Sequence, residues 1–147
     1  MIRSIRCEDA KAIRKICLAA LQHDTTEKLL VRRITELSDS DQYYLAVYEN
    51  DSTRHVEGFI QAEKYNLLYG DDGWNIIALA VAPEAQKNGI GRQLLAALED
   101  HTRNLGYRFV RLNCNIIRTE VHVFYESMGY HCDKTQKRFI KSITDIK

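Results

Sequence analysis

The residues with the clearest chemical potential surround two glycines near the middle of the chain. Gly89 and Gly91 stand where an apolar, strand-like run gives way to an amphipathic, helix-like one. A strand that turns tightly into a helix leaves several backbone N–H groups unpaired at the positive end of the helix dipole. Glycines let the backbone approach a ligand closely. With Lys87 and Arg92 beside the glycines, this segment has the features of a phosphate-binding turn.

Two common phosphate-binding motifs do not fit this stretch. A P-loop needs Lys and then Ser or Thr after its last glycine, whereas Gly91 is followed by Arg92 and Gln93. A dinucleotide-binding fingerprint needs a third glycine where Leu94 stands. The alternative is a plain strand-to-helix turn in which the glycines provide only tightness.

The wider pattern resembles the acetyl-coenzyme A signature of the GNAT superfamily of N-acetyltransferases. The matching positions are Leu79, Val81, Pro83, Gln86, Gly89 and Gly91, and the segment FYESMGY at residues 124–130 is similar to a second family motif. The resemblance implies that the backbone amides of the turn hold the coenzyme pyrophosphate and that the preceding strand pairs with the pantetheine arm. The cofactor-binding set it implies is Leu79, Ala80, Val81, Gln86, Lys87, Asn88, Gly89, Ile90, Gly91 and Arg92.

Acyl transfer from a thioester to an amine needs a neutral amine, a stabilised oxyanion and a proton donor for the departing thiolate. Tyr125 is the candidate donor, because a phenol is protonated at pH 7 and the family tyrosine faces the coenzyme sulfur. Periodicity alone allows a different interpretation, since Tyr125 shares an apolar helical stripe with Val121 and Met128. A backbone N–H near Leu79 or Ala80 is the expected oxyanion donor.

The general base is less clear. Many family members use a glutamate on the strand before the signature, but residues 74–79 contain no carboxylate. Glu63 on the preceding strand is the candidate base, with Asp71 and Asp72 as alternatives. A water chain without a dedicated base, or a solvated Glu63 with no role, also fits the sequence.

Two further positions stay open. Arg118 stands where the family often has an asparagine that contacts the pantetheine, so it either binds an anion or is a solvated loop residue. His122 lies three residues before Tyr125 on one expected helix face and could line a pocket. The spacings of Cys114, His122, His131 and Cys132 fit no common zinc pattern, so no metal is expected.

The elements that would position these residues follow from hydrophobic periodicity. The expected strands are 2–6, 43–49, 56–63, 74–81 (buried on both faces), 108–114 and 138–143, with one more short strand near Tyr130. The expected helices begin after a cap at Asp9, at Asp24 with Glu27 as capping-box partner, at Ile90 with an end at Gly106, and at Thr119 with an end at Gly129. A loop is expected at 65–73. This order predicts a mixed α/β fold, and the resemblance implies a GNAT-like, mostly antiparallel sheet with a splayed strand pair and about four helices.

The size and composition of the chain indicate its number of domains, its partners and its location. A chain of 147 residues, 45% hydrophobic and 28% charged, predicts a single soluble domain over residues 1–147. A formal charge of +1 argues against broad binding of nucleic acid or anionic membranes. No signal-peptide pattern and no apolar run of about 18 residues is present, so we expect no membrane partner and a cytoplasmic location with reduced cysteines. A homodimer is left open.

Together these patterns predict transfer of an acetyl group from acetyl-coenzyme A to a primary amine of a small, cationic acceptor. The charge of the acceptor is inferred from carboxylates in regions that flank the acceptor side of the family fold: Asp24, Glu27, Glu63, Asp71 and Asp72. The alternatives are acetylation of a protein or peptide amine and a non-catalytic module that binds acetyl-coenzyme A. The shapes of residues 22–27 and 65–74 would separate an open groove from a closed pocket.

Overall fold

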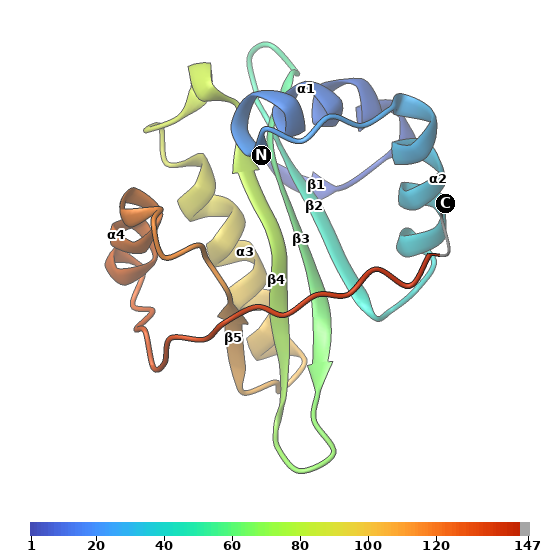
Figure 1. Cartoon of the computed structure of the whole chain (residues 1–147). Coiled ribbons are helices and arrows are strands. Elements are labelled where there is room, and N and C mark those ends of the chain that lie inside the picture. Colours follow the sequence, from blue (N-terminus) through green and yellow to red (C-terminus); the bar gives the residue numbers. More distant parts are fainter. Residues whose placement is uncertain (145–147) are drawn as a thin grey trace. The chain divides into compact units, whose positions relative to one another are not determined.

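The computed structural model describes residues 1–144, which divide into two compact units, Met1–Asn113 and a second that begins at Cys114. The first unit contains a five-stranded sheet in the order β1-β2-β3-β4-β5 (Figure 1). Its strands are β1 (Ile2–Ser4), β2 (Tyr43–Glu49), β3 (Val56–Asn66), β4 (Asp72–Val81) and β5 (Phe109–Leu112). The first three pairings are antiparallel and β4–β5 is parallel, which confirms the predicted mostly antiparallel sheet.

Four α-helices lie within the described residues, as the sequence predicts. They are α1 (Ala10–Leu21), α2 (Glu27–Ser38) and α3 (Ile90–Asn104) in the first unit, and α4 (Thr119–Ser127) in the second. Two short 3₁₀ turns, η1 (Cys7–Asp9) and η2 (Pro83–Ala85), precede α1 and α3. The predicted mixed α/β fold class is therefore confirmed.

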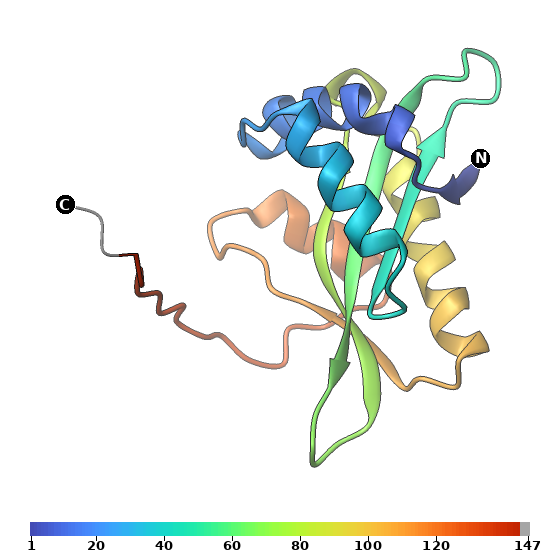
Figure 2. The same ribbon diagram turned by 90° about the vertical axis from the view of Figure 1, so that its right-hand side faces the viewer.

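The side chains of β3 alternate between the two faces of the sheet, and their neighbours show which helices cover each face. Phe59 and Gln61 line a small cavity of about 70 Å³ together with residues of α1 and α2. Gly58 points to the other face, where a Cβ atom would lie 3.1 Å from Ile90 Cγ2 of α3. The odd-numbered residues of β3 thus face α1 and α2, and the even-numbered residues face α3. Figure 2 shows these helices on opposite faces of the sheet.

The core of this unit has a layer on each face of the sheet, and most of its fully buried large side chains lie on the α3 face. Its fully buried large side chains include Trp74 of β4, Ile60 of β3 and Leu94, Leu95 and Leu98 of α3. Complete burial of each leucine contributes about 1.5–3 kcal/mol relative to exposure. The Trp74 ring lies 6.3 Å from Tyr44 and 5.7 Å from His101 between ring centroids, so aromatic contacts join β2, β4 and α3.

A bulge divides β4. Ala62 pairs with Ile76 but Gln61 pairs with Ala78, so Ile77 is an extra residue on this strand. The Ile77 side chain is 47% exposed. The prediction that residues 74–81 are buried on both faces is therefore wrong, because the bulge pushes Ile77 out of the pleat and several of its neighbours are only half-buried.

The N-caps of two helices differ from the sequence expectation. α2 begins at Glu27 rather than Asp24, because Thr26 is the N-cap and its Oγ1 accepts a hydrogen bond from the Leu29 amide at 3.1 Å. Asp9 occupies the N-cap position of α1, but its side chain does not cap the helix. It binds Arg3 instead, through bonds of 2.9 Å from both terminal nitrogens.

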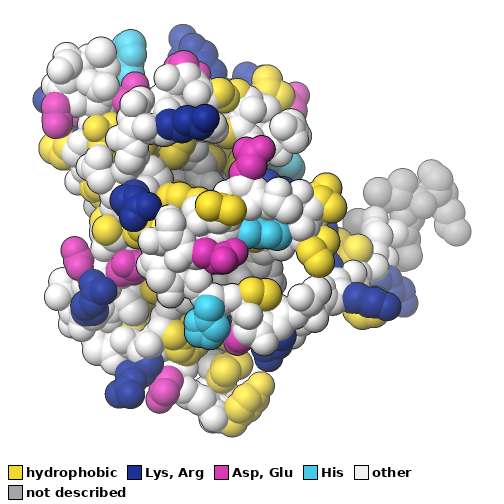
Figure 3. All heavy atoms as spheres, turned by 90° about the vertical axis from the view of Figure 1, so that its left-hand side faces the viewer, with side chains coloured by type: hydrophobic (Ala, Val, Ile, Leu, Met, Phe, Trp, Pro, Cys, Tyr) yellow, Lys and Arg dark blue, Asp and Glu magenta, His cyan; other side chains and the backbone are white. Residues whose placement is uncertain are grey.

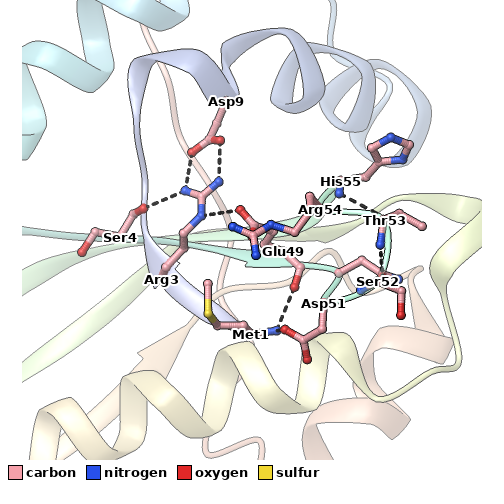
Figure 4. A network of polar contacts seen from close by, with 11 residues as sticks. Met1, Arg3, Ser4, Asp9, Glu49, Asp51, Ser52, Thr53, Arg54 and His55 are labelled. Atoms are coloured by element: carbon pink, nitrogen blue, oxygen red, sulfur yellow. Dashed lines mark hydrogen bonds and ion pairs between the residues drawn. The ribbon is translucent and has the colours of Figure 1, made fainter.

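Arg3 is the centre of a polar network with little solvent contact (Figure 4). Its guanidinium also donates through Nε to Glu49 at 2.8 Å, and Glu49 accepts from Arg54 on the β2–β3 turn at 3.0 Å. The side chains of Arg3, Asp9 and Glu49 are 12%, 6% and 7% exposed. The network ties β1, the start of α1 and the end of β2 together.

The predicted loop at 65–73 is shorter than expected, because β3 and β4 stay paired out to Asn66 and Asp72. The predicted strands near Tyr130 and at 138–143 are wrong, since residues 130–144 form no regular structure. Phe139, Ile140 and Ile143 are 79–89% exposed there. An alternating pattern forms a strand only where a neighbouring strand pairs with it.

Side chains of both charges are interspersed over the face drawn in Figure 3. This distribution agrees with the nearly balanced composition of the chain, +1 at pH 7. Within residues 1–144, no helix has the length and apolar character needed to cross a membrane.

Candidate active site

The turn between β4 and α3 leaves a row of backbone donors unused. Gly89 is the N-cap of α3 with φ +78°, and Lys87 also has a positive φ of +67°. No acceptor among the described residues contacts the backbone N–H groups of residues 87–91. A Cβ atom at Gly89 would meet nothing within 4 Å, so the turn is open. These donors lie at the positive end of a 15-residue helix, which suits them to an anion.

Gly58 sets the position of this turn. A side chain on Gly58 would lie 3.1 Å from both the Ala80 carbonyl oxygen and Ile90, and 3.2 Å from Leu94. The absence of that side chain lets the first turn of α3 pack directly on β3 and β4. The side chains of Gln86 and Asn88 bond to the Val81 and Ala85 carbonyl oxygens, at 3.2 and 3.1 Å, and hold the turn itself.

The predicted splay between β4 and β5 lies next to this turn. The two strands pair only from Gly73 with Phe109 to Ile76 with Leu112. Beyond that point, no strand of the described residues pairs with the outer edge of residues 77–81. Leu79, Ala80 and Val81 therefore lie on an edge that can accept an extended ligand in the manner of a strand.

A row of polar side chains crosses three strands just before this point of divergence. Glu63 of β3 pairs in register with Asn75 of β4, and Asn75 pairs with Arg111 of β5. Asn75 Nδ2 donates to Glu63 Oε2 at 2.8 Å, and Arg111 Nη1 donates to Asn75 Oδ1 at 2.7 Å. All three side chains are half-buried. The row lies on the face of the sheet that α1 and α2 cover in part.

The sequence interpretation found Glu63 but missed Asn75 and Arg111. Asn75 was read as part of an apolar strand, and Arg111 was one of many arginines. Only the strand register brings the two together, because 36 residues separate them along the chain. The one available signal was a charged residue in the middle of an otherwise apolar strand, FVRL.

Most of the other predicted carboxylates lie away from this row. Asp24 pairs with Arg14 at 3.9 Å and is 73% exposed. Glu27 is exposed in the first turn of α2, and Asp71 and Asp72 are exposed at the turn of the β3–β4 hairpin. Of the five predicted carboxylates, only Glu63 belongs to the polar row.

A separate hollow of about 550 Å³ lies between α1, η2 and the β2–β3 turn. Its lining carries both charges, including Lys11, Lys15, Glu57 and Glu84. None of the residues predicted for the site contributes to it.

The second unit contains Tyr125 on α4. Its ring is half-buried and packs edge-on against Tyr130, with centroids 5.7 Å apart. Burial raises the pKa of Tyr125 to about 12, Cys114 adds to this rise, and Arg118 opposes it. The hydroxyl is therefore protonated at pH 7 and can donate a proton or a hydrogen bond. His122 contacts the carbonyl oxygen of Asn115 at 2.9 Å through Nε2.

Among residues 1–144, no group of three or more His, Cys, Asp or Glu side chains is arranged to hold a metal ion.

Comparison with known proteins assigns the chain to a family. Residues 7–130, a stretch that includes parts of both units, match the Acetyltransferase (GNAT) family. The chain belongs to the GNAT acetyltransferases. A GNAT relative, the aminoalkylphosphonate N-acetyltransferase of Salmonella typhimurium, is 31% identical over 108 residues, which are 73% of this chain and 67% of the relative.

Solved structures of GNAT enzymes share the fold. Glucosamine-6-phosphate N-acetyltransferase from Arabidopsis thaliana superimposes with a TM-score of 0.78 at 19% identity, covering 97% of this chain and 98% of that one. An aminoglycoside antibiotic 6'-N-acetyltransferase from Acinetobacter baumannii gives 0.80 at 14% identity, covering 98% and 99%. At these identities the likeness concerns the fold alone.

Proposed function

We propose that this GNAT protein transfers the acetyl group of acetyl-coenzyme A to a primary amine of a small acceptor that is positively charged at that amine. The observation that carries the proposal is the unused donors of residues 87–91 beside an unpaired strand edge at residues 77–81. A coenzyme with a pyrophosphate and an amide-containing arm needs both features, and they are adjacent in the chain.

The residues present fit the coenzyme. In this proposal the backbone amides of residues 87–91 bind the pyrophosphate, since the Gln86 amide already donates to the Pro83 carbonyl oxygen at 3.4 Å. Lys87 and Arg92 supply positive charge. The backbone of Leu79, Ala80 and Val81 pairs with the pantetheine amides. When bound, acetyl-coenzyme A supplies the thioester carbonyl carbon that the amine attacks.

Glu63 is the proposed base. Its Oε2 is held by Asn75, which leaves Oε1 to accept a proton from the acceptor ammonium. The neutral nitrogen then forms the C–N bond as the C–S bond breaks. A carboxylate next to the point where β4 and β5 diverge is suited to this role, because that point is where the arm would end.

Tyr125 is the proposed donor to the departing sulfur. A thiol has a pKa near 8.5, so a phenol with a pKa of about 12 keeps its proton at any pH at which the enzyme works. Its hydrogen bond stabilises the developing thiolate. A proton given up to the sulfur is replaced through solvent by the second proton, which the acceptor nitrogen loses after the C–N bond forms, and the proton taken by Glu63 is released to solvent.

The positive charge of the acceptor is its ammonium group. The carboxylates that suggested a broadly cationic acceptor are spread along the first unit, so Glu63 is the one placed to attract that group. The Salmonella relative is named for an aminoalkylphosphonate, a small acceptor with an amine. This supports a small molecule in preference to a protein substrate.

A panel of amines tests the proposal. Release of free thiol from acetyl-coenzyme A would be measured with 2-aminoethanol, a polyamine, an aminoglycoside, 2-aminoethylphosphonate and a peptide with a free N-terminus, each against a blank without amine. We expect thiol release with at least one small amine and none with the peptide. Binding of the coenzyme without thiol release from any amine would show a non-catalytic module.

A further inference from the structure

Arg111 differs from Arg3 in the kind of partner it has. Arg3 donates to two carboxylates, Asp9 and Glu49, so its charge is neutralised within the fold. Arg111 donates to two amide oxygens, Oδ1 of Asn75 at 2.7 Å and Oδ1 of Asn113 at 2.9 Å. No carboxylate of residues 1–144 lies within ion-pair distance of it.

The Arg111 guanidinium is nevertheless held in place. Its central carbon lies 4.6 Å from the centroid of the Tyr65 ring, and that ring packs edge-on against Phe109 at 6.2 Å. A guanidinium has five N–H donors, and two of those of Arg111 have acceptors among the described residues. The remaining donors and an uncompensated charge are thus presented on a half-buried sheet face.

Asn75 keeps the two charges of the row apart. Its amide bonds to Glu63 on one side and to Arg111 on the other, so the carboxylate and the guanidinium do not pair with each other. Their strands are two spacings apart, roughly 10 Å between backbones. This arrangement presents a negative and a positive group side by side, at a distance that a small molecule can span.

We infer that the acceptor carries an oxyanion group, such as a carboxylate, phosphate or phosphonate, and that Arg111 binds it while Glu63 receives the amine. This inference rests on the proposed function, since it identifies the chemical class of the same acceptor. An ammonium at Glu63 and an oxyanion at Arg111 would orient the acceptor with its nitrogen toward the thioester. Arg111 is then the residue that determines specificity.

Calorimetry with matched ligands tests this without relying on turnover. 2-Aminoethylphosphonate and β-alanine carry an amine and an oxyanion, whereas 2-aminoethanol has the amine and a neutral hydroxyl. We expect the wild-type protein, saturated with coenzyme A, to bind at least one of the two zwitterions roughly 10–100-fold more tightly than 2-aminoethanol. Arg111→Gln should abolish that preference. Arg108→Gln, which removes an exposed arginine just before β5, should retain it.

The outcomes distinguish binding of an oxyanion by Arg111 from a purely structural role of this residue. If the wild type binds all three ligands equally or not at all, or if Arg111→Gln retains the preference, the inference is wrong. If Arg111→Gln lowers the affinity for 2-aminoethanol as much as the affinity for the zwitterions, Arg111 only supports the fold of the row. The inference is again wrong in that case. Selective binding that depends on Arg111, without acetyl transfer to any amine, would uphold the oxyanion site and refute the proposed enzyme.

Discussion

Arg3 and Asp9 face each other through two parallel hydrogen bonds of 2.9 Å, with both side chains almost fully buried. The pair joins β1 to the start of α1, and Glu49 extends it to the end of β2. Removal of this buried cation would leave the buried Asp9 carboxylate without its ion-pair partner and Glu49 with only the exposed Arg54. The stability of the first unit should therefore depend on Arg3 far more than on its surface arginines.

Replacing Arg3 by methionine tests this dependence. We expect Arg3→Met to lower the free energy of unfolding by about 3–5 kcal/mol, because the buried Asp9 loses its ion-pair partner and the buried Glu49 loses one of two. Arg33→Met is the control, since Arg33 pairs with Glu36 on the surface, and it should cost about 0–1 kcal/mol. Urea unfolding followed by circular dichroism measures both. Equal losses in the two variants would argue against a special role for the buried network.

Glu49 should make stability depend on pH. The hydrogen bond from Arg3 holds the pKa of Glu49 below its ordinary value, although burial opposes the shift. A carboxylate whose pKa is lowered on folding stabilises the protein above its unfolded pKa, near 4.3, and this contribution is lost as pH falls through the folded value.

The matched variant is Glu49→Gln. Its difference from wild type in free energy of unfolding should stay constant between pH 6 and 8 and shrink below about pH 5. Chemical denaturation across pH 3–8 measures this. A difference that persists unchanged down to pH 3 would contradict the assignment.

Gly91→Glu tests the turn before α3 as a pyrophosphate site. The new carboxylate lies in the first turn of α3, where a negative charge suits the helix dipole, so the fold should survive. The same charge repels a phosphate at the unused amides, and we expect affinity for coenzyme A to fall at least tenfold. Calorimetry measures the affinity. The control is Gln42→Glu, which adds the same charge at an exposed position before β2 and should leave the affinity for coenzyme A unaltered. A folded Gly91→Glu protein with wild-type affinity would show that the pyrophosphate does not bind at this turn.

Tyr125→Phe tests the proposed donor. The change removes only the hydroxyl, so coenzyme affinity should persist while turnover falls about 10²–10⁴-fold. Because the pKa of Tyr125 is raised to about 12, its ionisation should cause no fall in wild-type rate below about pH 11. Thiol release under conditions where chemistry limits the rate is the measurement. Tyr69→Phe removes a hydroxyl from a residue that is 87% exposed and is the control. Equal rates in the two variants would assign Tyr125 to packing alone.

Much of the fold could be predicted because the local signals were unambiguous. β2 has the predicted bounds, since its aromatic and β-branched residues end at a turn sequence, and α3 begins at Ile90 directly after a glycine with positive φ. The start of α2 could not be decided locally, because Asp24 and Thr26 are both good N-caps. The strand predicted at 138–143 failed for a different reason, since its pattern says nothing about a partner strand.

The candidate site likewise has one part that the sequence could predict and one part that it could not. The turn before α3 is contiguous in the chain, so the spacing of Gly89 and Gly91 was enough to find it. The row of Glu63, Asn75 and Arg111 exists only through pairing across three strands, and no local pattern encodes that register. Whether Arg111 is neutralised also depends on distant carboxylates, which a sequence does not place.

The extra residue at Ile77 has a consequence for insertions and deletions. Because the bulge shifts the two-residue alternation, Asn75 and Ala78 point to the same face although three positions separate them. Deleting Ile77 while the β3 pairing of residues 78–81 is kept would remove the bulge and restore regular alternation, so Asn75 would still pair with Glu63 and Trp74 would still face the core. A length change in the β3–β4 turn would leave both orientations intact. Among descendants of this sequence, changes of length should therefore be tolerated at the hairpin tip, and loss of a single residue should be tolerated at Ile77.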